Sequence, residues 1–243
     1  CLSRGLGDVY KRQGSMLNFI RGFCMALADS VPGVSGGTVA FLLGFYDKFI
    51  MSLDHLMSGT KEENIALLKK VITAQKDILK KNNLSDAPQV LTVYKEVEDY
   101  WHGTDKAEGL KKWNVLDDVT IMLCDDNFGN MRTLPTKEDK NRKGGYGMYY
   151  HFDYHGSPVS YEWVNSTPLP KVWEQLTMAY EYGIKDLWIV NVGDIRPQEL
   201  PLSYYMALAY DYEGMGINHP NETDDFIRGW VEEQFGGVVE DDD

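Results

Sequence analysis

Cysteine is scarce in this sequence of 243 residues, which contains three: Cys1, Cys24 and Cys124. Their spacing matches neither a disulfide framework nor a zinc motif, so we expect neither. Positive charge is also in short supply, because 24 Lys and Arg residues stand against 37 Asp and Glu residues and leave a formal net charge of −13. A chain with this charge is repelled by the phosphates of nucleic acid, which we exclude as a partner.

Long apolar runs are absent as well, since a helix needs about 20 consecutive apolar residues to span a bilayer. The nearest approach is a pair of apolar arms at 17–28 and 39–53, separated by the Pro/Gly-rich stretch 29–38. Two short arms around such a break predict a helical hairpin, either re-entrant in a membrane or buried in a globular protein. The Gly-rich backbone next to helix N-termini also suits a phosphate group.

The hairpin residues carry a first resemblance. The segments ADSVPGVSGGT at 28–38 and LGFYD at 43–47 closely resemble the polyprenyl-phosphate translocase family, long known as domain of unknown function 368. The resemblance covers about 16–65 and implies the N-terminal fragment of a membrane protein, without the further spans that transport requires. Residues 8–13, DVYKRQ, resemble a translated sequencing adapter, so we expect residues 1–15 to be an artefact.

Beyond residue 61 the pattern becomes polar and helical. Apolar residues from Ile65 to Leu79 form a stripe among Lys, Glu and Gln and predict a helix, and the periodicity of 90–100 predicts a second one. Further helices are expected at 170–183, where Gly183 closes an amphipathic segment, and in the two later stretches 202–210 and 225–235.

Strands alternate with these helices. We expect strands at 119–124, 147–154 and 187–192, each an apolar run that ends in polar residues. Strand–helix alternation and near-continuous apolar strands favour a parallel sheet covered on both faces. The predicted fold class is therefore α/β: an incomplete (β/α)8-type barrel segment, preceded by the short membrane-like helical hairpin. The three strands should be parallel neighbours or near neighbours in one sheet.

The polar residues follow the carboxyl ends of the three strands, where β/α barrels carry their active sites. The catalytic candidates are Asp125, Asp126, His151, Asp153, Asn191 and Asp194. The substrate-binding candidates are Asn127, Tyr150, Tyr154, Arg132 and Arg196. Paired carboxylates suit glycosidic cleavage, in which one acid protonates the leaving oxygen and a base activates water. Aromatic rings offer apolar faces to a sugar, and arginine binds both oxygens of a uronate carboxylate.

Other interpretations of the same residues remain open. Asp and Asn are common in turns, so each strand end alone has an ordinary structural explanation. His151 and Asp153 could form a buried pair on a strand, or could join Asp125 and Asp126 as metal ligands. Cys124 lies on an apolar strand, so we expect a buried and inert thiol.

A second resemblance rests on several motifs in order: DDVT at 117–120, DDNFGN at 125–130, GGYGMYYHFDY at 144–154, WIVNVGD at 188–194 and PLSYY at 201–205. Residues 71–237 resemble family 115 of the glycoside hydrolases, the xylan α-glucuronidases. The family implies removal of 4-O-methylglucuronic acid linked α-1,2 to xylan, with inversion and with no cofactor. The partner would be xylan or a glucuronoxylan oligosaccharide, and the compartment periplasmic or extracellular.

The resemblance also implies that the chain is incomplete. A whole barrel takes about 250 residues, and three strands are recognised here. We expect a partial barrel at 71–237, an acidic tail at 238–243, and a fusion in which the membrane-derived fragment is unrelated to the glycosidase. Such a fragment is expected to lack turnover, and a non-catalytic carbohydrate-binding remnant or a translocase fragment are the alternatives. The general acid and the general base stay unassigned among the candidates.

Overall fold

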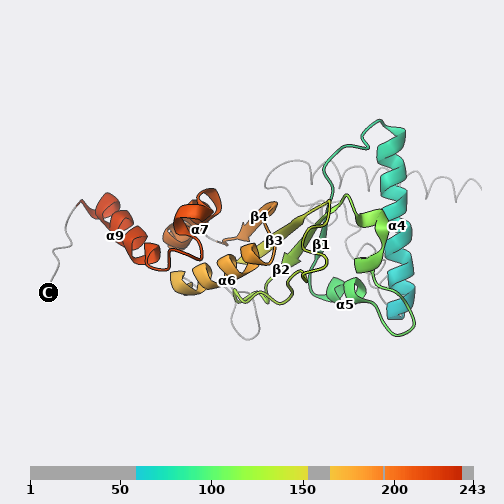
Figure 1. Ribbon diagram of the computed structural model, residues 1–243, viewed down its shortest axis with the longest axis horizontal. Helices are drawn as coiled ribbons and strands as arrows, with labels where there is room; N and C mark the ends of the chain where they lie inside the picture. The colour runs from blue at the N-terminus through green and yellow to red at the C-terminus, as the bar shows by residue number, and fades with distance from the viewer. Residues whose placement is uncertain (1–58, 153–164, 194, 237–243) are drawn as a thin grey trace, which may run out of the picture. The chain divides into compact units, whose positions relative to one another are not determined.

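The computed structural model describes residues 59–152, 165–193 and 195–236 (Figure 1). The chain divides into two compact units, Cys1–Asn64 and Ile65–Asp243, of which the second carries nearly all the described residues. The two apolar arms expected within 16–65, and their separation from the barrel segment, lie outside the described residues. In the described ranges no helix combines the length and the apolar character that crossing a bilayer requires.

Four parallel strands form the sheet at the centre of the second unit. They are β1 (Val90–Val93), β2 (Thr120–Cys124), β3 (Tyr146–His151) and β4 (Leu187–Asn191), hydrogen-bonded in the order β1-β2-β3-β4. The register pairs Cys124 with Tyr149 across β2 and β3, and His151 with Asn191 across β3 and β4. The prediction of three parallel strands in one sheet is therefore confirmed. Within the described ranges the sheet is open, and no barrel closes.

Strand β1 corrects the helix expected over 90–100. Val93, Tyr94, Val97 and Tyr100 follow helical spacing, but Val90–Val93 pairs with β2 over its whole length. The chain then turns at Lys95, where φ is +47°, and a short helix, α5 (Glu96–His102), follows. Val90 and Val93 are β-branched and suit a strand, and pairing with a buried neighbour outweighs a weak helical period.

The helices that precede and follow the strands lie close to where the sequence places them. Helix α4 spans Lys61–Lys81, and acidic Glu62 and Glu63 in its first turn complement the helix dipole. Helix α6 (Leu169–Glu181) ends before Gly183, whose φ of +100° a residue with a side chain adopts only under strain. Three helices complete the C-terminal part: α7 (Glu199–Tyr210), α8 (Tyr212–Met215) and α9 (Glu222–Phe235).

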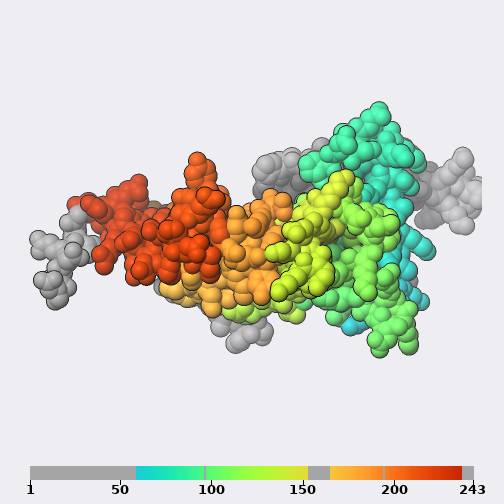
Figure 2. Space-filling model, in the orientation of Figure 1, coloured from blue at the N-terminus to red at the C-terminus, as the bar shows by residue number. Residues whose placement is uncertain are grey.

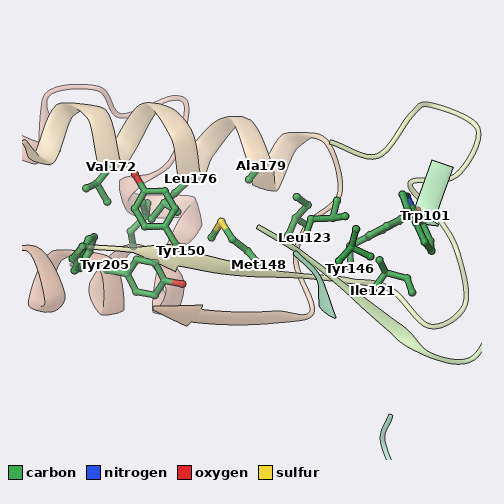
Figure 3. Packing of buried hydrophobic residues seen from close by; sticks show 14 of the residues in the cluster. Trp101, Ile121, Leu123, Tyr146, Met148, Tyr150, Val172, Leu176, Ala179 and Tyr205 are labelled. Atoms are coloured by element: carbon green, nitrogen blue, oxygen red, sulfur yellow. The ribbon is translucent and has the colours of Figure 1, made fainter. Parts of the chain in front are cut away.

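One face of the sheet packs against helices and forms the hydrophobic core. Figure 3 shows Val172, Leu176 and Ala179 of α6 beside Met148 and Tyr150 of β3, all of them buried. From α7, Tyr205 packs against the same strand, with its ring centroid 6.4 Å from that of Tyr150. In Figure 2 the yellow residues of the β2–β3 segment lie directly against the orange residues of α6 and β4, which in turn adjoin the red C-terminal helices. On the opposite face of the sheet, Tyr149 and His151 of β3 lie side by side.

Candidate functional site

Strand parity separates the two kinds of side chain on β3. Tyr149 and His151 lie on one face with ring centroids 4.5 Å apart, while Tyr150 and Phe152 lie on the other, 5.8 Å apart. His151 and Phe152 therefore point to opposite faces, as the alternation of side chains along a strand requires. We call the face that bears Tyr149, His151 and their neighbours Tyr94 and Asn191 the site face. Its polar groups lie at the carboxyl ends of all four strands.

The centre of the site face is a buried pair formed by Asp125 and His151. Oδ1 of Asp125 lies 2.6 Å from Nδ1 of His151, and Oδ2 accepts the backbone N–H of His151 at 2.9 Å. The relative exposures of the two residues are 1% and 2%. The pair thus joins the end of β2 to the end of β3, and orients the imidazole.

The carboxylate of Asp125 is fully used by this arrangement. Besides the two contacts with His151, it accepts the backbone N–H of Asn127 at 3.1 Å and that of Gly129 at 3.1 Å. Both oxygens are committed to donors of the protein, which suits an orienting role better than proton exchange with a substrate. With Nδ1 held by Asp125, Nε2 is the atom of His151 that could exchange a proton with a ligand.

Two tyrosines extend the network to the outer strands. The hydroxyl of Tyr94, just after β1, donates to Oδ1 of Asn127 at 2.8 Å, and the Tyr94 ring stacks on His151 with centroids 6.1 Å apart. On the other side, Nδ2 of Asn191 donates to the Tyr149 hydroxyl at 3.0 Å. Tyr94, Tyr149 and Asn191 are half-buried, so a ligand on this face would meet them before His151.

Asp126 stabilises the loop after β2. Its carboxylate accepts the backbone N–H of Phe128 at 2.9 Å and both the backbone and side-chain N–H of Asn130. Burial alone would raise the pKa of Asp126, but these hydrogen bonds and the charge of Lys171 outweigh it and lower the pKa. Asp126 therefore stays ionised as a loop carboxylate, and it does not converge with His151.

The side chains of Tyr150 on β3 and Cys124 on β2 are buried. Tyr150, expected to contact a sugar, is fully buried among the helices, and its hydroxyl donates to the carbonyl of Gly129 at 2.9 Å. This corrects the prediction, because a ring in the core offers no face to a ligand. Cys124 is buried as expected, and burial, with the nearby charges of Asp125 and Glu98, raises the pKa of its thiol to about 12.

The two candidate arginines lie outside the network of the site face. Arg132 forms an ion pair with Glu98 of α5 at 2.9 Å, so its charge is already compensated. Arg196 is exposed in the short 3-10 helix Arg196–Gln198 after β4. Asp153, Tyr154 and Asp194 lie outside the described residues. Asp125, His151, Asn127 and Asn191 are thus the candidates that the structure brings together.

Sequence reasoning missed Tyr94 and Tyr149. Tyr94 lies in the stretch 90–100, whose spacing predicts a helix, and Tyr149 lies among the apolar residues of the strand expected at 147–154. The available signal was parity, because Tyr149 stands two residues before His151 and must share its face. In the described part of the chain, no group of three or more His, Cys, Asp or Glu side chains is placed to hold a metal ion.

The arrangement combines groups suited to a polar, ring-shaped ligand. Tyrosine rings provide apolar faces, and hydroxyl and amide groups provide hydrogen bonds. A buried imidazole stands beneath them with its tautomer fixed by a carboxylate. These are the features of a sugar-binding surface at the carboxyl end of a parallel sheet.

Comparison with known proteins agrees with this chemistry. A solved structure described as a family 115 4-O-methyl-α-glucuronidase with specificity for decorated arabinogalactans is similar, with a TM-score of 0.63 and 35% identity. The similarity covers 72% of this chain and 22% of that one, so the chain spans about a fifth of that relative's length. The polyprenyl-phosphate transporter of Vibrio cholerae is 44% identical over 43 residues, which are 18% of this chain and 14% of the transporter.

The family model described as "Glycosyl hydrolase family 115" matches residues 44–242. The match begins before residue 71, where the motifs place the start of the glycosidase segment, and overlaps the stretch 16–65 that resembles the translocase. It contains every strand of the sheet and the whole of the site face. The chain belongs to glycosyl hydrolase family 115.

Proposed function

We propose that the chain is part of a glycosidase that removes 4-O-methylglucuronic acid, linked α-1,2 to xylan, by an inverting mechanism. The observation that carries this proposal is the Asp125–His151 pair beneath the half-buried groups of Tyr94, Tyr149 and Asn191 at the carboxyl ends of parallel strands. The similar structure is described as that of a 4-O-methyl-α-glucuronidase, which supports the same sugar. Sequential parallel strands, with α5 between β1 and β2 and α6 between β3 and β4, also support a barrel as the complete architecture.

In this proposal the described residues bind and orient the sugar. Tyr94 and Tyr149 present their rings, Asn191 holds the Tyr149 hydroxyl, and His151 exchanges a proton through Nε2. Inversion requires a second group that activates water, about 6.5–9.5 Å from the acid. Asp153 and Asp194, which follow β3 and β4, are the candidates for that partner. We propose a periplasmic or extracellular location, because the substrate is a polysaccharide.

The relative's specificity for decorated arabinogalactans favours a second candidate substrate. The sugar removed would be the same, and the polysaccharide that carries it would differ. A single set of ligands separates the two: xylo-oligosaccharide with one 4-O-methylglucuronic acid branch, the same oligosaccharide without the branch, and decorated arabinogalactan.

The test measures binding of these ligands to the chain by saturation-transfer NMR, and release of free acid by chromatography. We expect binding of the branched xylo-oligosaccharide in preference to the unbranched one, and loss of this binding in Asn191→Ala. The control is Glu174→Ala, which changes an exposed residue of α6. Equal affinity for the branched and unbranched oligosaccharides would refute a glucuronate site. Tighter binding of decorated arabinogalactan than of the branched xylo-oligosaccharide would indicate arabinogalactan, not xylan, as the substrate.

Turnover separates the enzyme from a binding remnant. If acid is released, inversion predicts that the first product from an α-linkage is the β-anomer, which NMR resolves before mutarotation. Binding without release would support a carbohydrate-binding remnant without turnover, whereas release of the α-anomer would contradict an inverting mechanism.

A further inference from the structure

A glucuronate ligand carries a negative charge, and this chain has a formal net charge of −13. A cation close to the site face would therefore favour binding. We propose that Lys95 binds the carboxylate of the glucuronic acid and gives the site its preference for an acidic sugar. This inference rests on the proposed function, and it assigns a residue that sequence reasoning did not consider.

The position of Lys95 is the first argument. It follows Tyr94 at the carboxyl end of β1, and its Nζ lies 5.0 Å from the centroid of the Tyr94 ring. That ring stacks on His151, and its hydroxyl donates to Asn127. The ammonium group is therefore in contact with the aromatic wall of the site face. Lys95 itself is exposed and accessible to a ligand from solvent.

The backbone is the second argument. In an extended strand, Lys95 would point away from the face that carries Tyr94. Instead its φ of +47° and ψ of −110° break the alternation, and the ammonium lies over the Tyr94 ring. A lysine gains nothing from a positive φ, which a glycine would adopt without strain. Backbone strain of this kind concentrates at functional sites.

The cations near the ends of β2 and β3 provide the third argument. Arg132 is paired with Glu98 at 2.9 Å, and Nζ of Lys171 donates to the carbonyl of Phe128 at 2.5 Å. Nδ1 of His151 is occupied by Asp125. Among the side chains that the structure describes, no carboxylate forms an ion pair with Lys95, so its charge is available to an anionic ligand.

The experiment compares two ligands that differ in charge: methyl α-D-glucuronoside and its neutral methyl ester. Binding of each to the chain is measured by NMR titration. We expect the wild-type chain to bind the acid more tightly than the ester. In Lys95→Ala the affinity for the acid should fall about 10- to 100-fold, which is the range for a charge-assisted hydrogen bond, while the affinity for the ester should change little.

Two further variants separate recognition from folding. Lys95→Arg keeps the charge and should retain the preference for the acid. Lys95→Gly removes the charge but relieves the positive φ, so it should lose the preference for the acid while melting at a higher temperature than the wild type. Lysine in a merely structural role would leave the ratio of the two affinities unchanged in both Lys95→Ala and Lys95→Gly, and that result would overturn the proposal.

A matched control lies at the opposite end of the sheet. Lys185, shortly before β4, also places its ammonium over a tyrosine ring, 4.1 Å from the centroid of Tyr180. Lys185→Ala removes the same charge and the same kind of contact, and should leave both affinities unchanged. An equal loss in Lys185→Ala would show a general charge effect and would also overturn the assignment. If the wild type binds neither ligand, the proposed function fails, and the assignment of Lys95 fails with it.

Discussion

Oδ1 of Asp125 lies 2.6 Å from Nδ1 of His151, and Oδ2 of the same carboxylate accepts the backbone N–H of that histidine. One buried carboxylate thus fixes both the ring and the main chain of His151. Two more backbone donors, Asn127 and Gly129, complete its hydrogen bonding. The ends of β2 and β3 are joined by a single side chain, so the site and the stability of the sheet depend on the same group.

Replacement of Asp125 should therefore be costly. We expect Asp125→Asn to reduce the free energy of unfolding by about 3–5 kcal/mol, because an amide presents N–H groups where the site supplies donors. Urea denaturation followed by far-UV circular dichroism measures the difference. Glu174→Gln, on the exposed face of α6, is the matched carboxyl-to-amide control and should change stability by less than about 0.5 kcal/mol. A similar small change in Asp125→Asn would contradict the structural role of the pair.

The strands from β2 onward could be predicted from sequence because each is an apolar run followed by polar residues. The alternation of side chains along β3 then places His151 and Phe152 on opposite faces. Strand β1 could not be predicted this way, since Val90–Val93 is short and the residues after it continue a helical spacing. Its conformation is decided by pairing with β2, which is a tertiary contact.

The sequence predicts that the site lies at the carboxyl ends of the strands, but it does not predict the role of each residue there. Sequence places Asp125, Asp126 and Asn127 together, but their roles differ with backbone geometry. Asn127 takes a φ of +70° and meets Tyr94, while Asp126 turns into its own loop. Tyr150 has the same chemistry as Tyr149, and strand parity alone sends it into the core. The contact of Asn127 with Tyr94 joins residues far apart in sequence, so the sequence alone does not reveal it.

Gly145, which precedes β3, should not tolerate a side chain. Its φ is +67°, and a Cβ there would lie 2.2 Å from Oδ2 of Asp186, which accepts the backbone N–H of Tyr146 at 2.9 Å. We expect Gly145→Ala to lower the free energy of unfolding by about 2 kcal/mol, from backbone strain and a displaced hydrogen bond. Thermal melting and urea titration report the loss.

Gly229 provides the opposite case and serves as the control. It lies inside α9, and a Cβ there would meet no atom within 4 Å. Gly229→Ala should raise stability by about 0.5–1 kcal/mol, because alanine loses less conformational entropy in a helix. If the free energy of unfolding changed in the same direction in Gly145→Ala and Gly229→Ala, the positive φ at Gly145 would be contradicted.

Cys124 should resist thiol reagents in the folded chain. Its side chain is buried, and burial raises the pKa of the thiol to about 12, so the reactive thiolate is rare near neutral pH. We expect iodoacetamide to leave Cys124 unmodified under native conditions and to label it in urea. Peptide mass spectrometry assigns the label to Cys124 rather than to Cys1 or Cys24, and rapid native labelling would contradict the burial.

Asp126 should make the loop after β2 sensitive to acid. Burial works against its ionisation, but the hydrogen bonds from Asn130 and Phe128 and the charge of Lys171 prevail, so the pKa in the folded state is below the ordinary value of 3.8. A carboxyl group with a lowered pKa stabilises the folded state above its unfolded pKa. That contribution is lost as the pH falls through the folded value.

The comparison of Asp126→Asn with the wild type tests this dependence. Near neutral pH the variant should be less stable, because an amide accepts fewer of the N–H donors. As the pH falls below about 4 the wild type should lose this advantage, since protonation of Asp126 removes the same acceptor, and the difference between the two free energies of unfolding should shrink. Urea titrations at several pH values give that difference directly, so the acidic groups common to both chains, Asp118 and Asp139 among them, cancel. A difference that stayed constant over this range would mean that the Asp126 carboxylate is not held by the loop.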